Sequence, residues 1–257
     1  MFTKFQATAI AALVGVALTF AGAAKATNLV MDGSFDQLSG GIGQIGYNGT
    51  SLTGWTNGHD GSGNLGYTFV YSSGSADTTG ANGVSGNVKL WGPNDGSANG
   101  LPATSPDGGN YIASDGAYQT APLSQTINGL TSGAQYTVSF WFAGAQQSGY
   151  RGTNTEQWLV SLGGQQLATN ILKNTDEGFT GWQYTTLTFT ATSSSEVLSF
   201  LAAGTPSGVP PFSLLDGISM SQVVSTPEPG SIAMLLTGLG AIGVIARRRQ
   251  MVRARAA

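Results

Sequence analysis

The sequence predicts an all-β fold, a sandwich or a barrel, for the central part of the chain. Short runs of β-branched and aromatic residues are separated by Gly, Asn, Ser and Thr, and no long stretch has helical periodicity. In the clearest run, residues 136–143, Val138, Phe140 and Phe142 alternate with polar positions. A period of two places apolar side chains on one face, as a half-buried strand requires.

The first 26 residues have the features of a secretory signal peptide. Lys4 supplies a positive start, residues 7–20 are apolar apart from two threonines, and Ala24-Lys25-Ala26 fits a small-x-small cleavage site. We expect cleavage before Thr27; an uncleaved N-terminal anchor is the alternative. The outer part, residues 27–225, is then long enough for one domain with a hydrophobic core.

The outer part is strongly acidic. It has three basic residues (Lys89, Arg151 and Lys173) against twelve Asp and Glu, a formal charge of −9. Such a surface offers no footprint for nucleic acid or anionic lipid, and suits solubility or Ca²⁺ binding. The chain has no cysteine, which excludes disulfides and thiol chemistry, and its single histidine, His59, excludes multi-histidine zinc sites.

We predict strands wherever β-branched and aromatic residues cluster between turn residues. In chain order they are residues 28–31, 67–71, 87–91, 110–113, 123–127, 136–143, 157–162, 182–190, 197–202 and 214–220. Residues 165–168 are expected to return as a hairpin after Gly163-Gly164. The segments 40–64 and 92–109, rich in Gly, Ser and Asn, are interpreted as long loops of the same domain. The main core residues are predicted to be Val138, Phe140, Phe142, Leu187, Phe189, Phe200 and Leu215.

Three stretches resemble jelly-roll carbohydrate-binding modules. Residues 28–36 are similar to their opening strand, residues 123–127 with the strand 136–142 to their middle, and residues 215–220 to their last strand. The resemblance implies a jelly-roll type β-sandwich in which the first and last strands lie close together. Carboxylates there can hold a structural Ca²⁺, which implies Asp36 and Asp216 as metal ligands. Gly217 stands where the family often has a second acidic residue.

A second candidate for calcium is the loop 95–100. Asp95, Ser97 and Asn99 place oxygen ligands at alternate positions before Gly100, as in a calcium loop. The twelfth position should be Glu and is Pro106. Ordinary turn chemistry explains the same residues, so we prefer the turn.

Catalysis is not expected. Glycoside hydrolysis needs two carboxylates about 5 to 10 Å apart across a sugar. Five acidic residues could contribute, but nothing in their spacing selects a pair: Asp115, Glu156, Asp176, Glu177 and Glu196. No Gly-x-Ser-x-Gly elbow is present, and no serine motif accompanies His59.

Aromatic residues near the long loops are the candidates for a sugar-binding platform, because flat apolar rings stack on sugar rings. Trp55 and Trp91 border the long loops, and Tyr118 lies in another loop. The remaining tryptophans fall in predicted strands and are expected to be core or half-buried: Trp141, Trp158 and Trp182.

The end of the chain, residues 226–257, has three parts in a fixed order. Pro227-Glu228-Pro229 favours an extended peptide, because proline cannot sit inside a helix and restricts the residue before it. Residues 231–246 carry no charge and would span about 24 Å as a helix, against a hydrocarbon core of about 30 Å. Arg247-Arg248-Arg249 would then remain in the cytoplasm.

This arrangement resembles the PEP-CTERM sorting signal of Gram-negative bacteria. The resemblance implies cleavage near Pro227-Glu228-Pro229 by a membrane protease of the exosortase type, followed by release or attachment at the cell surface. An ordinary membrane anchor that is never cut is the alternative. Residues 238–243 match a dinucleotide-binding fingerprint, but the preceding strand and the later acidic residue that this site needs are missing.

The sequence therefore predicts a protein exported by the secretion machinery and tethered to the inner membrane as a precursor. It would then reach the cell surface or the extracellular matrix. We expect a non-catalytic structural or adhesive role in the envelope, the exopolysaccharide or a biofilm. A true carbohydrate-binding module is the alternative, and a glycan hydrolase is the third hypothesis. A pull-down on glycans would separate the first two.

Overall fold

The computed structural model describes residues 27–224, 235–240, 242–243 and 247. The chain divides into two compact units, Ala26–Val224 and the two terminal segments. In the terminal unit the described residues 235–240, 242–243 and 247 are helical. No helix among the described residues has the length and hydropathy of a membrane span. The expected signal peptide and the Pro227-Glu228-Pro229 motif lie outside the described residues.

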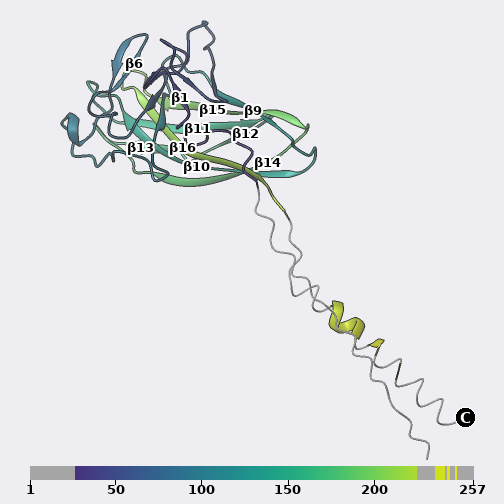
Figure 1. Cartoon of the computed structure of the whole chain (residues 1–257). Helices are drawn as coiled ribbons and strands as arrows, with labels where there is room; N and C mark the ends of the chain where they lie inside the picture. Colours follow the sequence, from purple (N-terminus) through teal and green to yellow (C-terminus); the bar gives the residue numbers. More distant parts are fainter. Residues whose placement is uncertain (1–26, 225–234, 241, 244–246, 248–257) are drawn as a thin grey trace, which may run out of the picture. The chain divides into compact units, whose positions relative to one another are not determined.

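The unit Ala26–Val224 is almost entirely β-structure (Figure 1). Its short early strands are β1 (Leu38–Ser39), β2 (Gly43–Gln44), β3 (Ser51–Leu52), β4 (Thr56–Asn57), β5 (Thr68–Tyr71), β6 (Ala81–Gly83) and β7 (Gly86–Val88), followed by the 3₁₀ turn η1 (Pro93–Asp95). The later strands are β8 (Tyr111–Asp115), β9 (Leu123–Asn128), β10 (Gln135–Gln146), β11 (Asn154–Leu162), β12 (Gln165–Ala168), β13 (Leu172–Asn174), β14 (Gln183–Thr190), β15 (Ser195–Thr205) and β16 (Pro211–Gln222).

The strands form two large sheets with jelly-roll connectivity. Sheet B has the order β14-β10-β16-β8-β5-β2-β6-β7, and sheet C has the order β12-β11-β15-β9-β4. From β8 to β11, and again from β14 to β16, each strand lies in the opposite sheet from the one before it. The two rows β8-β16-β10-β14 and β9-β15-β11-β12 are those of an eight-stranded jelly roll, a double-sheet Greek-key fold. The predicted fold class is confirmed by this strand order.

The main core lies between the two sheets. It contains Val138, Phe140, Phe142, Phe189, Phe200 and Leu215, with Leu187 partly buried against it, so the predicted core is confirmed. Strand β10 pairs with β14 over residues 135–142 and with β16 over residues 136–146, so these two strands lie on either side of it (Figure 1). Trp158 enters this core from β11, and its indole N–H donates to the carbonyl of Leu214 at 2.9 Å.

A second core covers the other face of sheet B. Phe69, Tyr71, Tyr111 and Phe212 of sheet B form this core together with Ala81 and Val88 of β6 and β7 in the same sheet. Ala76, Leu90 and Leu101, which lie outside the strands, complete it. Strands β5 and β8 are consequently buried at every position. A strand covered on both faces loses the alternation of a half-buried strand. The segment 92–109, interpreted from the sequence as a long loop of this domain, is a loop apart from η1, and its Leu101 packs in this second core.

Two predictions in the first half of the outer part were wrong. Residues 28–31 are not a strand, although the Leu29 N–H donates to the Met220 carbonyl at 2.8 Å beside β16. Asp32 and Phe35 adopt positive φ angles of 49° and 56°, which interrupts the extended conformation that a strand requires, although the Gly33 carbonyl still accepts the Ile218 N–H of β16 at 3.0 Å. The segment 40–64, expected to be a loop, contains the short strands β2, β3 and β4.

A β-bulge shapes the middle of β16. Its register with β10 shifts between Ser139 and Trp141, and Asp216 stands opposite Trp141. Gly217, at φ 60°, is the extra residue of this bulge. A Cβ atom at Gly217 would lie 3.0 Å from Asp107 Cγ and 3.1 Å from Trp141 Cδ1. Glycine at this position therefore allows the loop around Asp107 to cover Asp216.

The sandwich has two distinct ends. The loop that follows β8, the loop between β10 and β11 and the loop between β15 and β16 meet at one end, which we call the loop end. Strand β16 begins there at Pro211, opposite Gln146, and ends at Gln222, opposite Tyr136. The N–H of Val223 then donates to the carbonyl of Gln135 at 2.9 Å. The chain therefore leaves the sandwich at the end opposite to the loop end.

Candidate functional site

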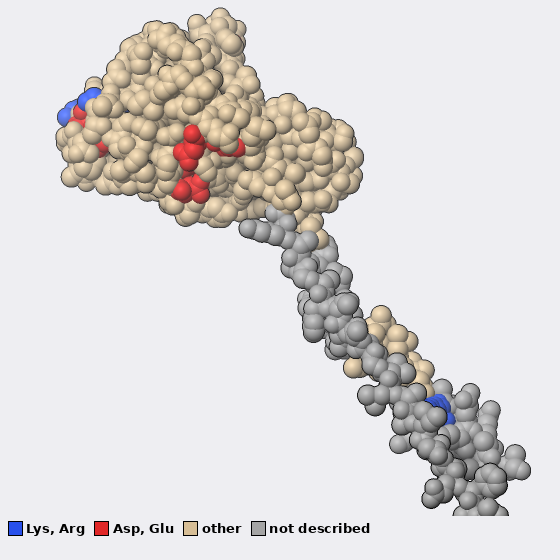
Figure 2. All heavy atoms as spheres, in the orientation of Figure 1, with Lys and Arg blue, Asp and Glu red and all other residues tan. Residues whose placement is uncertain are grey.

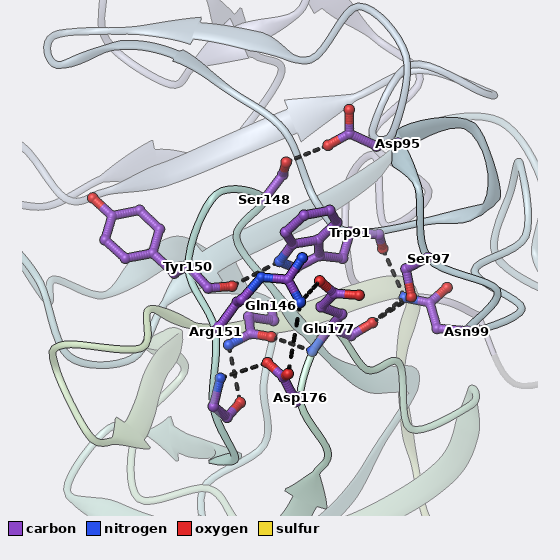
Figure 3. A network of polar contacts seen from close by, with 11 residues as sticks. Trp91, Asp95, Ser97, Asn99, Gln146, Ser148, Tyr150, Arg151, Asp176 and Glu177 are labelled. Atoms are coloured by element: carbon purple, nitrogen blue, oxygen red, sulfur yellow. Dashed lines mark hydrogen bonds and ion pairs between the residues drawn. The ribbon is translucent and has the colours of Figure 1, made fainter.

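The loop end carries a compact polar and aromatic network around Trp91 and Arg151 (Figure 3). The indole N–H of Trp91 donates to the carbonyl of Tyr150 at 2.8 Å. The Arg151 guanidinium lies over the Trp91 ring, 5.4 Å from its centroid, and pairs with the carboxylates of Glu177 and, at 3.9 Å, Asp176. One face of Trp91 is thus covered by a cation whose charge is balanced by two acids.

Main-chain anchors hold the loops of this network together. The Ser97 hydroxyl and the Asn99 amide donate to the Glu177 carbonyl at 2.8 and 2.9 Å. Asn99 also donates to the Trp91 carbonyl at 2.9 Å. The fully buried side chain of Gln146 accepts the Glu177 N–H at 2.6 Å. The segments around residues 91–99 and 175–178 are therefore fixed to the end of β10.

Asp95 belongs to the same end of the sandwich, where its carboxylate contacts Lys89 and Ser148. Lys89 and Arg151 are two of the three basic residues of the outer part. In the view of Figure 2, the Lys and Arg atoms of the sandwich lie at one edge. Because Asp95 is paired with Lys89, its carboxylate is already engaged in an ion pair, which favours a turn over a calcium loop at residues 95–100.

The three predicted platform residues do not share one surface. Trp55 is only 6% exposed and packs in the main core between Phe35 and Phe200, with ring centroids 5.5 and 6.2 Å away. Its indole N–H donates to the Asp32 carbonyl at 3.0 Å. Trp55 lies between the short strands β3 and β4, and both it and Leu52 belong to the main core.

Trp91 and Tyr118, in contrast, both lie at the loop end, and Tyr150 joins them. Tyr118 is 46% exposed and packs edge-on against Tyr67 at 5.1 Å. The pKa of Tyr67 is raised to about 12 by burial and then by the nearby Asp115, Tyr118 and Tyr150. Tyr150 is 44% exposed, and sequence reasoning missed it. Its position in the Gly-flanked turn after the long strand β10 was the available signal.

Sequence analysis also missed an aromatic pair, Trp141 and Tyr184, on the uncovered part of sheet B. Trp141 of β10 and Tyr184 of β14 have ring centroids 5.1 Å apart. Tyr184 is 56% exposed. Neighbouring strands bring the two rings together through the register pair Trp141–Tyr184, which a single sequence does not reveal.

The structure brings the two predicted calcium ligands, Asp36 and Asp216, close to each other. Asp216 is fully buried, and its pKa is raised to about 8 by burial and then by the negative charges of Asp107 and Asp36, against a hydrogen bond from Ser105. Its Oδ1 atom has no hydrogen-bond partner. Asp36 is exposed, and its Oδ1 accepts the N–H of Asn110 at 3.0 Å.

The donor chemistry of this region suits a hard cation, since Ca²⁺ takes carboxylate and carbonyl oxygens and Asp216 Oδ1 is a buried acceptor without a donor. However, no group of three or more His, Cys, Asp or Glu residues among the described residues is arranged to hold a metal. Backbone carbonyls or water would have to supply the remaining ligands of a six- to eight-coordinate ion.

The carboxylates considered for glycosidase chemistry have separate structural surroundings. Asp115 Oδ1 accepts the N–H groups of Ala117 and Tyr118 at 2.8 and 3.1 Å, and burial raises its pKa to about 7. Glu196 Oε1 accepts the Thr192 N–H at 2.7 Å. Asp176 and Glu177 pair with Arg151.

Glu156 differs from these carboxylates because it lies inside the sandwich. It is 1% exposed, neither of its oxygens has a hydrogen-bond partner, and burial raises its pKa to about 8. The nearby Asn174 amide donates instead to the Gly178 carbonyl at 3.1 Å. A carboxyl in this environment is mostly protonated at neutral pH.

Two hollows lie on the outer face of sheet C. The larger, about 510 Å³, is lined by nine residues: Leu29, Met31, Gly54, Thr56, Ser124, Gln125, Thr126, Asn128 and Val197. The smaller, about 330 Å³, is lined by Gly116, Thr155, Gln157, Ile171, Ala203, Gly204 and Thr205. Neither lining contains a charged or aromatic side chain. The predicted aromatic residues and carboxylates all lie outside these two hollows.

Comparison with known proteins identifies the tail. The family described as "PEP-CTERM protein-sorting motif" matches residues 225–250, so the chain carries this motif. The motif implies export and an exosortase-processed, membrane-anchored precursor. No curated protein matches the chain.

Solved structures that resemble the sandwich include carbohydrate-binding modules. TmCBM61 in complex with beta-1,4-galactotriose is 14% identical, with 77% of this chain and 99% of that chain covered and a TM-score of 0.42. A "Family 16 Carbohydrate Binding Module-2" is 15% identical, with 75% and 99% covered and a TM-score of 0.35. An arabinose-bound α-L-arabinofuranosidase, MgGH51, is 15% identical, with 76% and 26% covered and a TM-score of 0.38.

Proposed function

We propose that the chain is a non-catalytic protein of the cell envelope or exopolysaccharide matrix of a Gram-negative bacterium, with a structural or adhesive role. The observation that carries this proposal is the position of the sorting motif. It begins at residue 225, directly after β16 has completed the jelly roll at Gln222. A folded outer domain is thus joined without a long linker to a signal for surface sorting.

The surroundings of the carboxylates support a role without catalysis. Those with hydrogen-bond partners stabilise turns or pair with Arg151, and Glu156 is enclosed between the sheets away from solvent. A glycosidase needs two carboxyl groups that face a sugar across a cleft. The arrangement of these groups therefore supports a structural role for them.

In this proposal the tail acts in steps, each with its own residues. The secretion machinery exports the outer domain, and the apolar residues 231–246 hold the chain in the inner membrane. Arg247, Arg248 and Arg249 keep the end of the chain in the cytoplasm, since basic residues resist translocation. The exosortase then recognises Pro227-Glu228-Pro229 and cuts close to it, which delivers the outer domain to the surface or the matrix.

Mass spectrometry of the surface fraction tests the proposal. The wild-type product should end near residues 227–229. Replacing Pro227-Glu228-Pro229 by alanines should preserve export and leave uncut chain in the inner membrane. Val224→Ala, just upstream of the motif, is the matched control and should be cut as wild type. Intact wild-type chains ending at Ala257 on the surface would show that the tail is only an anchor.

A second candidate function is glycan binding at the loop end. It is favoured by Tyr118 and Tyr150, which are both about half exposed at the loop end, because exposed rings can stack on sugars. Tyr118 packs on Tyr67, and the Tyr150 carbonyl accepts the indole N–H of Trp91. Retention of the outer domain on exopolysaccharide should fall in Tyr118→Ala and in Tyr150→Ala. Val197→Ala, an exposed apolar residue near the start of β15 at the other end of the sandwich, is the control. Equal retention of all three variants would exclude the loop end as the binding site.

A further inference from the structure

One edge of sheet B is formed by a long strand whose outer side has no partner strand. Strand β14 (Gln183–Thr190) is the last strand on this side of the sheet and has eight residues, Gln-Tyr-Thr-Thr-Leu-Thr-Phe-Thr. The other described sheet edges end on shorter strands: β7 has three residues, β12 has four and β4 has two. Short edges limit pairing with another chain, whereas a long edge is a template for it.

Strand β14 also lacks the features that usually protect an edge. It contains no charged residue, proline or glycine, and its ladder with β10 has no register shift. Proteins commonly protect exposed edges with lysine, proline or a bulge. In an outer part with a formal charge of −9, eight consecutive uncharged edge residues create a place where two copies can approach with little repulsion.

The hydrogen bonds identify which main-chain groups of β14 face outward. The Thr190 N–H donates to the Gln165 side chain at 3.0 Å, and the Ala191 N–H donates to the Ala134 carbonyl at 3.0 Å. Thr190 therefore faces away from β10 and Ala191 toward it. Because main-chain groups alternate along a strand, Tyr184, Thr186 and Thr188 also face outward. These outward groups form no hydrogen bond with another described residue.

We propose that β14 pairs with β14 of a second copy of this chain, antiparallel and about a two-fold axis at Thr186. This register places Tyr184 opposite the partner subunit's Thr188 and pairs each outward residue with another outward residue. Three such pairs form about six main-chain hydrogen bonds, two for each pair. The interface is isologous, so the same strand supplies both sides and closes a dimer.

Side chains on both faces of β14 suit this pairing. On the outer face the exposed Tyr184, backed by Trp141, would lie over the partner subunit's Thr188, and cross-strand aromatic–β-branched pairs stabilise sheets. On the inner face Leu187, only partly buried in the monomer, would lie opposite the partner subunit's Thr185. Pairing would therefore cover apolar surface that the monomer leaves open.

A second copy is favoured over another partner because every copy carries the same sorting motif at residues 225–250 and is directed to the same surface. The pairing deepens the structural role proposed above. Its test is independent of that role, because a cross-link reports on the edge and fractionation reports on sorting.

The absence of cysteine from the chain allows a clean test in the full-length protein. Thr186→Cys places one thiol on the proposed axis, where opposite Cα atoms lie about 5.5 Å apart, within disulfide range. Mild oxidation of cells expressing this variant should give a disulfide-linked species of twice the chain mass. Thr126→Cys, also an exposed threonine in a strand, is the matched control and should remain monomeric.

Adding Thr188→Pro to Thr186→Cys sharpens the test. Proline is tolerated where an edge N–H faces solvent, so the monomer should keep its melting temperature. The pairing should be lost, because this N–H would bond to the partner. Equal cross-linking of Thr186→Cys and Thr126→Cys, persistence of the dimer in the double variant, or a cross-link to a protein of different mass would each overturn the proposal.

Discussion

The two cores of the sandwich differ in composition and in how the chain builds them. The main core between the sheets is formed mainly by Phe, Trp and aliphatic residues, many of them at alternating positions of long strands, such as Val138, Phe140 and Phe142. The outer core on sheet B contains Tyr67, Tyr71 and Tyr111, and five of its fourteen buried residues come from the segment 72–109, which has little regular structure. Periodicity therefore reveals the first core, and only the tertiary fold reveals the second.

The difference predicts that the main core determines global stability. Trp158→Ala removes a large, fully buried side chain and its hydrogen bond to Leu214, so the free energy of unfolding should fall by about 3–5 kcal/mol. Urea denaturation measures this loss. Trp182→Ala, a partly exposed tryptophan at the outer core, is the comparison and should cost clearly less. Equal losses would show that the two cores are energetically alike.

We expect the outer core to open locally while the two sheets remain folded. Leu90→Ala removes a fully buried side chain that joins the segment 72–109 to sheet B, a change that costs about 2–5 kcal/mol in a core. We expect most of this cost to appear as local opening, with faster hydrogen exchange in residues 72–109 and unchanged protection of β11 and β15. Faster exchange throughout both sheets would mean that the cores form one cooperative unit.

Calcium binding at Asp36 and Asp216 is a third prediction, on the same outer face of sheet B. An ion that binds only the folded state at 100 times its Kd stabilises it by about 2.7 kcal/mol. The melting temperature should therefore fall with chelator in the wild type and stay constant in Asp216→Ala. Asp60→Ala, an exposed acidic residue in a turn, is the control and should keep the response to chelator. A wild-type melting curve unaffected by chelator would remove the site.

Glu156 should make stability depend on pH. Its folded pKa, about 8, lies above its usual value of 4.5, so the folded state binds more protons than the unfolded state between these values. The stability that Glu156 contributes is complete below about pH 4.5 and is lost as pH rises through about 8. Glu156→Gln keeps the neutral shape and should make this part of the pH–stability curve less steep, while the raised pKa values of Asp115 and Asp216 keep the remaining slope. An unchanged curve would show that the Glu156 carboxyl is not held in its protonated form in the folded protein.

The sequence predicted what depends on local pattern. The strands from 110–113 to 214–220 and the core around Phe140 are confirmed because a period of two is a local property. The partners of Trp55 and Trp141 could not be predicted, since burial of the first and pairing of the second depend on strand register. Tyr118 and Trp91 were predicted as binding residues because they lie in or beside loops. That both lie at the same end of the sandwich as Tyr150 depends on the jelly-roll connections, which the sequence does not reveal.

The course of β16 has a mechanical consequence. This strand lies between β10 and β8, begins at the loop end and leads directly to the sorting motif. A load carried by the loops and resisted at the tail would pull along β16 and shear its hydrogen bonds with β10. Bonds sheared together share the load, whereas bonds at a peeled strand end break one after another. A domain held at the surface through β16 is therefore built to resist tension along that strand.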